Sequence, residues 1–162
     1  MPRPALAVAA LALAIAVPTL PACKRGPAPP SGNIAARLAV PTRGDVVFDP
    51  ATLGGKPAIV VFWRPGCGYC RQELPDAMRA ATERGVTVVA VQVAEGKEAG
   101  GAVLAKLGWQ GVDLVDDGTL RRDLKVSSVP WTLVLRSDGT AARAFVGAQS
   151  YATLERALAS VK

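Results

Sequence analysis

The sequence predicts one α/β domain, with a mixed central β-sheet, helices on both faces, and an antiparallel hairpin and a helix at the C-terminus. Short apolar runs rich in β-branched residues alternate with stretches of helical periodicity, as in Ile59–Trp63 followed by Cys67–Arg84. Ser137-Asp138-Gly139-Thr140 separates two later apolar runs, and Asp-Gly is a strong hairpin signal. The 162 residues suffice for one domain with a substantial core and not for two.

The first half of the domain contains two strand candidates and one long helix. Val46–Phe48 is a candidate for a short strand. Ile59–Trp63 has no polar residue, as expected for a strand that is covered on both faces. Cys67–Arg84 is predicted to be helical because its apolar residues recur every three or four positions, and Gly85 ends it. The apolar stripe of this helix consists of Leu74, Ala77, Met78 and Ala81.

The second half repeats the alternation of strands and helices. The expected elements are strands Val86–Val93 and Val112–Val115, helices Glu98–Leu107 and Thr119–Leu124, and the hairpin strands Trp131–Arg136 and Ala141–Val146. The helix after Glu98 is predicted to be weak because it contains Gly100-Gly101. Ser150 is predicted to cap a final helix, whose apolar stripe consists of Tyr151, Leu154, Leu158 and Val161.

The N-terminus has the layout of a secretory signal peptide. Residues 5–17 are Ala, Leu, Val and Ile only, with Arg3 before them and Leu20-Pro21-Ala22-Cys23 after them. This apolar stretch is shorter than the roughly 20 residues that a membrane span needs. Its ending resembles the lipobox of bacterial lipoproteins, in which the cysteine becomes the lipidated first residue. We therefore expect a signal peptide at 1–22 and lipid on Cys23. An ordinary signal peptide with an incidental cysteine, or an uncleaved anchor, is the alternative.

Residues 23–36 are predicted to be a lipidated cysteine followed by a flexible tether, and residues 37–162 the folded domain. Lys24–Asn33 is rich in Pro, Gly and Ser and has little to bury. The formal net charge is +6, but basic and acidic residues are interleaved and aromatic residues make up only 5%. With an export signal as well, this composition argues against a nucleic-acid partner.

Cys67-Gly68-Tyr69-Cys70 directly follows the apolar run Ile59–Trp63, where a buried strand would turn into a helix. Helix N-terminal amides and the flanking Arg64 and Arg71 favour a thiolate at the first position. Cys67 is the predicted attacking thiol because it is the more N-terminal and would lie in the exposed turn. Cys70, one turn deeper, would resolve a mixed disulfide. Half a zinc site has the same spacing, but the chain has no His and only three Cys, so we expect no metal and no other cofactor.

Over roughly residues 38–162 the chain resembles the thioredoxin-fold family. Phe62-Trp63-x-x-x-Cys67-Gly68-Tyr69-Cys70 is similar to the family's FWAxWCxxC, and Pro75 falls where the active-site helix carries its kinking proline. Val129-Pro130-Trp131-Thr132 resembles the cis-proline loop, and Phe145-Val146-Gly147 the glycine near the end of the last strand.

Within this fold the chain is most similar to the TlpA/ResA branch of envelope thiol-disulfide oxidoreductases. Cys70-Arg71-Gln72-Glu73-Leu74-Pro75 matches that branch's C-[KR]-x-E-x-P motif. Gly55-Lys56-Pro57 matches the GK-P that precedes its first core strand, and the extra helix and strand expected between residues 94 and 115 fill the place of its central insertion. Three positions depart from the usual pattern: Gly66 replaces a Trp before the first cysteine, Val61 replaces the buried acid of cytoplasmic thioredoxins, and Trp131 stands where Thr is usual.

The resemblance implies roles for five further residues. Glu73 is expected to be exposed in the first turns of the helix, where it would take or return the proton on Cys70. The alternative is that Glu73 has no catalytic role and is present because Glu is favoured in the first turns of any helix. Pro130 would follow a cis peptide bond, leaving the Val129 backbone free to pair with an extended client. An ordinary strand-opening proline is the alternative. Tyr69 and Trp131 would flank the sulfur pair as an apolar client platform.

The resemblance thus implies a monomeric, membrane-anchored periplasmic thiol-disulfide oxidoreductase. It would reduce the disulfides of exported proteins with electrons from a membrane-embedded donor, as in cytochrome c maturation or disulfide repair, so its partners would be exported protein disulfides or thiols. The competing hypothesis is a non-catalytic thioredoxin-like envelope module in which Cys67–Cys70 is a structural disulfide, although so short a loop constrains the unfolded chain little. A copper-delivery protein of this fold is a further rival, but it needs a His that the chain lacks.

Overall fold

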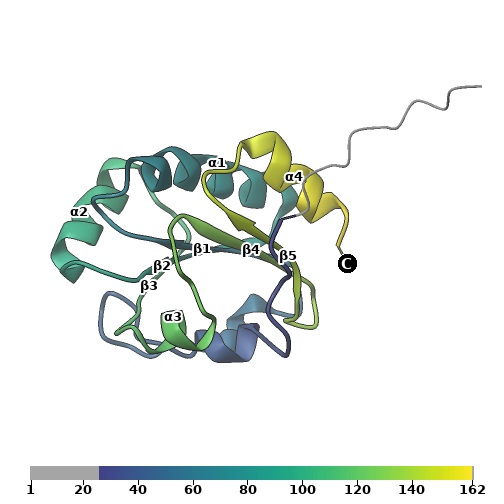
Figure 1. Cartoon of the computed structure of the whole chain (residues 1–162), viewed down its shortest axis with the longest axis horizontal. Coiled ribbons are helices and arrows are strands. Elements are labelled where there is room, and N and C mark those ends of the chain that lie inside the picture. Colours follow the sequence, from purple (N-terminus) through teal and green to yellow (C-terminus); the bar gives the residue numbers. More distant parts are fainter. Residues whose placement is uncertain (1–25, 162) are drawn as a thin grey trace, which may run out of the picture.

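A computed structural model describes residues 26–161, and Figure 1 shows a central sheet between two layers of helices. The strands are β1 (Ala58–Trp63), β2 (Thr87–Gln92), β3 (Val112–Val115), β4 (Trp131–Leu135) and β5 (Ala141–Val146). The helices are α1 (Gly68–Arg84), α2 (Lys97–Lys106), α3 (Thr119–Asp123) and α4 (Tyr151–Ala159), with short 3-10 helices η1 (Ala35–Leu38) and η2 (Pro50–Leu53). Helices α1, α2 and α4 cover one face of the sheet, and α3 lies with η1 and η2 on the other.

The sheet is mixed, as predicted. Its strand order is β3-β2-β1-β4-β5, with β1, β2 and β3 parallel and β4 antiparallel to both β1 and β5. All six residues of the central strand β1 are buried, which explains why this segment carries no polar side chain. The predicted α/β class, with helices on both faces and a terminal hairpin and helix, is therefore confirmed.

Alternation along β1 creates two separate cores. Ile59, Val61 and Trp63 face the α1 layer, whereas Val60 and Phe62 face the opposite core. Leu74 of α1 is fully buried against the first set, and burial of such a side chain contributes about 1.5–3 kcal/mol. This packing holds α1, and with it the two cysteines, against the end of β1.

Helix α1 begins and ends as its sequence predicts. Cys67 is the N-cap, with an extended backbone and its Sγ accepting from the Cys70 N–H at 3.1 Å. Pro75 lies inside the helix, where it removes one backbone donor. Gly85 ends the helix in the left-handed region at φ 62°, a conformation that costs a residue with a Cβ more than it costs glycine.

The structure corrects two expectations near the N-terminus. Val46–Phe48 is not a strand: Val46 and Val47 are 68% and 61% exposed, and Val47 makes only an isolated bridge to Pro41. The tether is also shorter than predicted, because Ile34 is fully buried and η1 packs within the domain. The packed domain therefore begins at about Asn33, which bridges to Thr140. Cys23 and the signal segment lie outside the described residues.

The N-terminus of α4 is capped differently from the expectation. The Ser150 side chain makes no capping hydrogen bond to the backbone of the helix. Instead, the Asp76 carboxylate on α1 accepts a hydrogen bond from the Tyr151 N–H at 3.0 Å. An acid at a helix N-terminus also interacts favourably with the helix dipole. Asp76 thereby links the two helices that cover the cysteine face of the sheet.

Candidate active site

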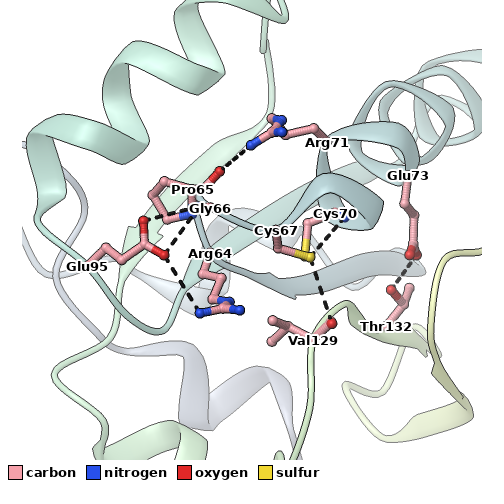
Figure 2. Close-up of a disulfide and its surroundings, with 10 residues drawn as sticks. All are labelled: Arg64, Pro65, Gly66, Cys67, Cys70, Arg71, Glu73, Glu95, Val129 and Thr132. Carbon is pink, nitrogen blue, oxygen red and sulfur yellow. Dashed lines mark hydrogen bonds and ion pairs between the residues drawn. A yellow bond between two sulfur atoms is a disulfide. The ribbon is translucent and has the colours of Figure 1, made fainter.

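A disulfide joins Cys67 and Cys70 at the junction of β1 and α1 (Figure 2). Cys67 is 8% exposed, whereas Cys70 is completely buried in the core beneath α1. The difference follows from the helix geometry, since Cys67 is the N-cap at the edge of the sheet and Cys70 lies one turn inward. Of the two cysteines in the disulfide, only Cys67 is accessible from the surface.

The loop before β4 lies directly beside Cys67. The Val129–Pro130 peptide bond is cis, as predicted, and the Val129 carbonyl oxygen is 3.8 Å from the Cys67 Sγ. A disulfide sulfur has no proton to donate, so this approach is a van der Waals contact in the oxidised form. After reduction, a Cys67 thiol at the same place has a backbone acceptor within reach.

The two arginines that flank the motif have other partners in the oxidised protein. Arg71 donates to the Pro65 carbonyl oxygen at 2.7 Å, and Arg64 pairs with Glu95 at 3.9 Å (Figure 2). The Glu95 carboxylate also accepts from the Gly66 N–H, at 3.2 and 3.1 Å for its two oxygens. Glu95 could not be predicted from the sequence, because nothing in the local pattern brings the loop after β2 to the residue before Cys67.

Glu73 is buried, in contrast to the expectation of an exposed residue. It is 1% exposed, and its Oε1 accepts a hydrogen bond from the Thr132 hydroxyl at 2.5 Å (Figure 2). Among the described residues, its Oε2 has no hydrogen-bond partner. Burial raises the pKa of Glu73 from 4.5 to about 7, although the bond from Thr132 favours the charged form. The carboxyl points into the core because Glu73 lies one helical turn after Cys70, which is itself buried.

The structure does not place the two proposed platform aromatics together. Tyr69 is 69% exposed beside Cys67. Trp131 is only 7% exposed and packs edge-on against Phe62 at 5.3 Å, in the core on the opposite side of the sheet from the disulfide. Because Trp131 packs in the core on the face of the sheet away from the disulfide, the prediction that it flanks the sulfur pair as part of an apolar client platform is wrong.

Residues 26–161 contain neither a cluster of metal-binding side chains nor a membrane-spanning helix. No group of three or more His, Cys, Asp or Glu side chains in this range is arranged to hold a metal ion. No helix in the same range combines the length and apolar character needed to cross a membrane.

Comparison with known proteins identifies the family. Residues 45–162 match the thioredoxin-like domain family. The chain belongs to the thioredoxin-like family. Its disulfide-forming pair, Cys67 and Cys70, stands at the start of α1, and the chain is a thioredoxin-like thiol-disulfide oxidoreductase.

Relatives of this thioredoxin-like protein include secreted ones. It is 30% identical over 141 residues to the soluble secreted antigen MPT53 of Mycobacterium tuberculosis, covering 86% of this chain and 82% of the relative. A secreted M. tuberculosis disulfide oxidoreductase homologous to E. coli DsbE shares 28% identity at a TM-score of 0.68, over 78% of this chain and 98% of that one. A thiol:disulfide interchange protein from Chlorobium tepidum shares 25% identity at a TM-score of 0.66, and the match covers 85% of this chain and 96% of that one.

Proposed function

We propose that the protein is a monomeric, lipid-anchored oxidoreductase on the periplasmic side of a bacterial envelope, and that it reduces disulfides in exported proteins. The observation that carries the proposal is the asymmetry of the pair, with Cys67 at the surface beside the Val129 carbonyl and Cys70 fully buried. The signal-like segment before Cys23 and the secreted relatives support the location. Residues 1–22 would be removed and Cys23 would carry the lipid.

The reaction follows from the positions of the two sulfurs. The Cys67 thiolate attacks one sulfur of a client disulfide, forming a mixed disulfide and releasing the other client sulfur as a thiolate, which takes up a proton. The Cys70 thiolate then attacks the Cys67 sulfur, restoring the Cys67–Cys70 disulfide and releasing the second client thiolate. Two electrons pass to the client. The oxidised form described here is the product of that step.

Glu73 would carry the proton of the second step. Cys70 must lose its proton before it can attack, and it is shielded from water. A carboxyl with a pKa of about 7 is present in both protonation states near neutral pH, so it can accept the proton and return it. The hydrogen bond from Thr132 would hold one carboxylate oxygen in place and leave the other for this exchange.

The client would lie across the Val129–Pro130 loop beside Tyr69. Val129 presents its carbonyl oxygen next to Cys67, and an extended client could pair with this backbone as an added strand. Exposed Tyr69 offers an apolar contact. After each turnover a membrane-embedded dithiol donor would return the two electrons, as in cytochrome c maturation or disulfide repair.

A reduction assay tests the proposal. The mature protein in detergent, supplied with a recycling dithiol, should accelerate reduction of insulin, and Cys67→Ala should abolish the acceleration. Glu73→Gln should slow turnover and alter its pH dependence, whereas Glu98→Gln, an exposed acid on α2, should change neither. If the parent protein does not accelerate reduction at all, the chain is better explained as a binding module with a structural disulfide.

A further inference from the structure

Cys67 opens onto a groove that carries positive charge. The groove has a volume of about 450 Å³ and runs between the start of α1 and the segment that leads to the cis proline. Its lining includes Arg64 and Arg121 together with Ser127, Ser128 and Val129, and none of its lining residues is acidic. In Figure 2 both Arg64 and Val129 lie below the disulfide.

The positive charge continues away from the cysteine along α3. A neighbouring hollow shares Arg121 and Ser127 with the groove and adds Arg122 and Lys125. Both added side chains are exposed. A strip of cations, which we call the basic strip (Arg64, Arg121, Arg122 and Lys125), therefore extends from the redox-active sulfur across the surface of α3.

The acids near the strip have bonding partners of their own. The exposed Asp117 accepts from the Thr119 N–H at 2.8 Å, and the exposed Asp123 pairs with Arg37 at 3.1 Å. Asp116 is 7% exposed, and its two oxygens accept from the Leu120 and Arg121 N–H groups at 2.9 Å each. Glu95 accepts from the Gly66 N–H and also pairs with Arg64 of the strip at 3.9 Å. None of these carboxylates belongs to the groove lining, and among residues 26–161 the Arg121 guanidinium makes no ion pair with any of them.

Arg121 is held in place before any client arrives. Its Nε donates to the Val126 carbonyl oxygen at 3.1 Å, and its two terminal nitrogens make no hydrogen bond within residues 26–161. A fixed guanidinium with free terminal donors suits a carboxylate, which it can bind with two parallel hydrogen bonds. Because it is already ordered, less rotamer freedom is lost on binding.

We propose that this groove selects client segments with Asp or Glu beside the reacting cysteine. The inference rests on the proposed function and names its substrate class. Arg121 would bind the client carboxylate while Val129 pairs with the client backbone and Cys67 meets the client sulfur. The rest of the basic strip would steer acidic segments toward the groove, an effect that salt weakens.

The test uses three disulfide peptides that differ only in Glu, Gln or Lys beside the cysteine. The reduced mature protein should reduce the Glu peptide at least tenfold faster than the Lys peptide at low salt. Arg121→Gln should cut that ratio to threefold or less, whereas Arg143→Gln, an exposed cation on β5, should leave it unchanged. Equal rates for the Glu and Lys peptides would overturn the inference.

Binding measurements separate this inference from the proposed function. If no peptide is reduced, the proposed function fails. The same peptides with Ser in place of Cys can still be titrated against the oxidised protein. Tighter binding of the Glu peptide, lost in Arg121→Gln, supports the selectivity, and equal affinities for the Glu and Lys peptides contradict it.

A second, independent observation concerns the loop that carries Glu95. Glu95 has φ 66°, a left-handed conformation that is uncommon for a residue with a side chain. The buried amide of Gln92 holds this loop from within, since its Nε2 donates to the carbonyl oxygens of Ala94, Glu95 and Gly96 at 3.0, 3.2 and 3.0 Å. Unusual backbone held by a buried network is typical of functional sites.

Gly66, the residue before Cys67, leaves room for the carboxylate of this loop. A Cβ on Gly66 would lie 2.9 Å from the Glu95 Oε1, so any larger residue would displace the carboxylate from the Gly66 N–H. The Trp that the resembling family usually carries at this position is therefore incompatible with the arrangement. Figure 2 shows Glu95, Gly66 and Cys67 in sequence along one side of the site.

We infer that Glu95 is a positioning residue that makes the dithiol more reducing. Its negative charge opposes the effects that stabilise a Cys67 thiolate, which come from the α1 N-terminus and from Arg64, Arg71 and Arg121. A less stable thiolate makes the reduced form less stable and lowers the reduction potential.

The test is the redox equilibrium of the protein with glutathione. Glu95→Gln should shift the equilibrium constant three- to tenfold toward the reduced form, about 15–30 mV in potential. It should also speed alkylation of Cys67 at neutral pH. Glu98→Gln, which removes the same charge three residues away, should do neither. An unchanged equilibrium in Glu95→Gln, or an equal shift in Glu98→Gln, would overturn the inference.

Discussion

Replacing Glu73 with Gln should stabilise the oxidised domain at alkaline pH and leave its stability nearly unchanged in acid. The folded protein binds the Glu73 proton with a pKa of about 7, whereas the unfolded chain releases it at its ordinary value of 4.5. The raised folded pKa contributes stability that is fully present below pH 4.5 and is lost as the pH rises through 7. At 1.36 kcal/mol per pKa unit, the loss amounts to about 3 kcal/mol.

Gln keeps the shape of the carboxyl and cannot ionise, so the Glu73→Gln variant does not lose this folding stability as the pH rises. The comparison is urea unfolding of both oxidised proteins between about pH 4 and 9, with Glu98→Gln as an exposed control. The gap between parent and Glu73→Gln should be small at about pH 4 and approach 3 kcal/mol above about pH 8. A gap that stays constant across this range would refute the burial argument.

Three further predictions concern the thiols, the carboxyl and the anchor. In the reduced protein, Cys67 should alkylate much faster than Cys70, which peptide mass mapping detects; equal rates would reverse the assigned roles. Thr132→Val should raise the pKa of Glu73 further and cost about 1 kcal/mol, read from the same pH-dependent unfolding; an unchanged profile would argue against the hydrogen bond. Cys23→Ser should move the protein from membranes to the soluble fraction, and an intact mass that retains the signal peptide without acyl groups would contradict lipidation.

The fold could be predicted because its signals are local. Continuous β-branched runs gave β1 and β2, Gly85 marked the end of α1, and Asp138-Gly139 gave the hairpin. The short strand predicted at Val46–Phe48 is wrong because a strand also depends on a non-local partner. Apolar composition alone does not supply a neighbouring strand, and Val46 and Val47 remain exposed.

Parts of the site could not be predicted because they depend on register and on contacts between distant loops. β4 pairs with β1 so that Thr132 lies opposite Val61 and Trp131 opposite Phe62. Adjacent strand residues point to opposite faces, so this register brings Thr132 to Glu73 and sends Trp131 to the other core. A shift of one residue would exchange the two, and the sequence pattern of β4 does not distinguish them.

The central claim is that Cys67 attacks client disulfides and Cys70 resolves them, and a trapping experiment tests it most directly. Cys70→Ala and Cys67→Ala variants of the full chain are expressed in a bacterial envelope, free thiols are blocked, and mixed disulfides are identified by non-reducing electrophoresis and mass spectrometry. Cys70→Ala should accumulate adducts linked through Cys67, and Cys67→Ala almost none, because only Cys67 reaches the surface. No adducts in either variant, with both destabilised alike, would show that the disulfide is structural.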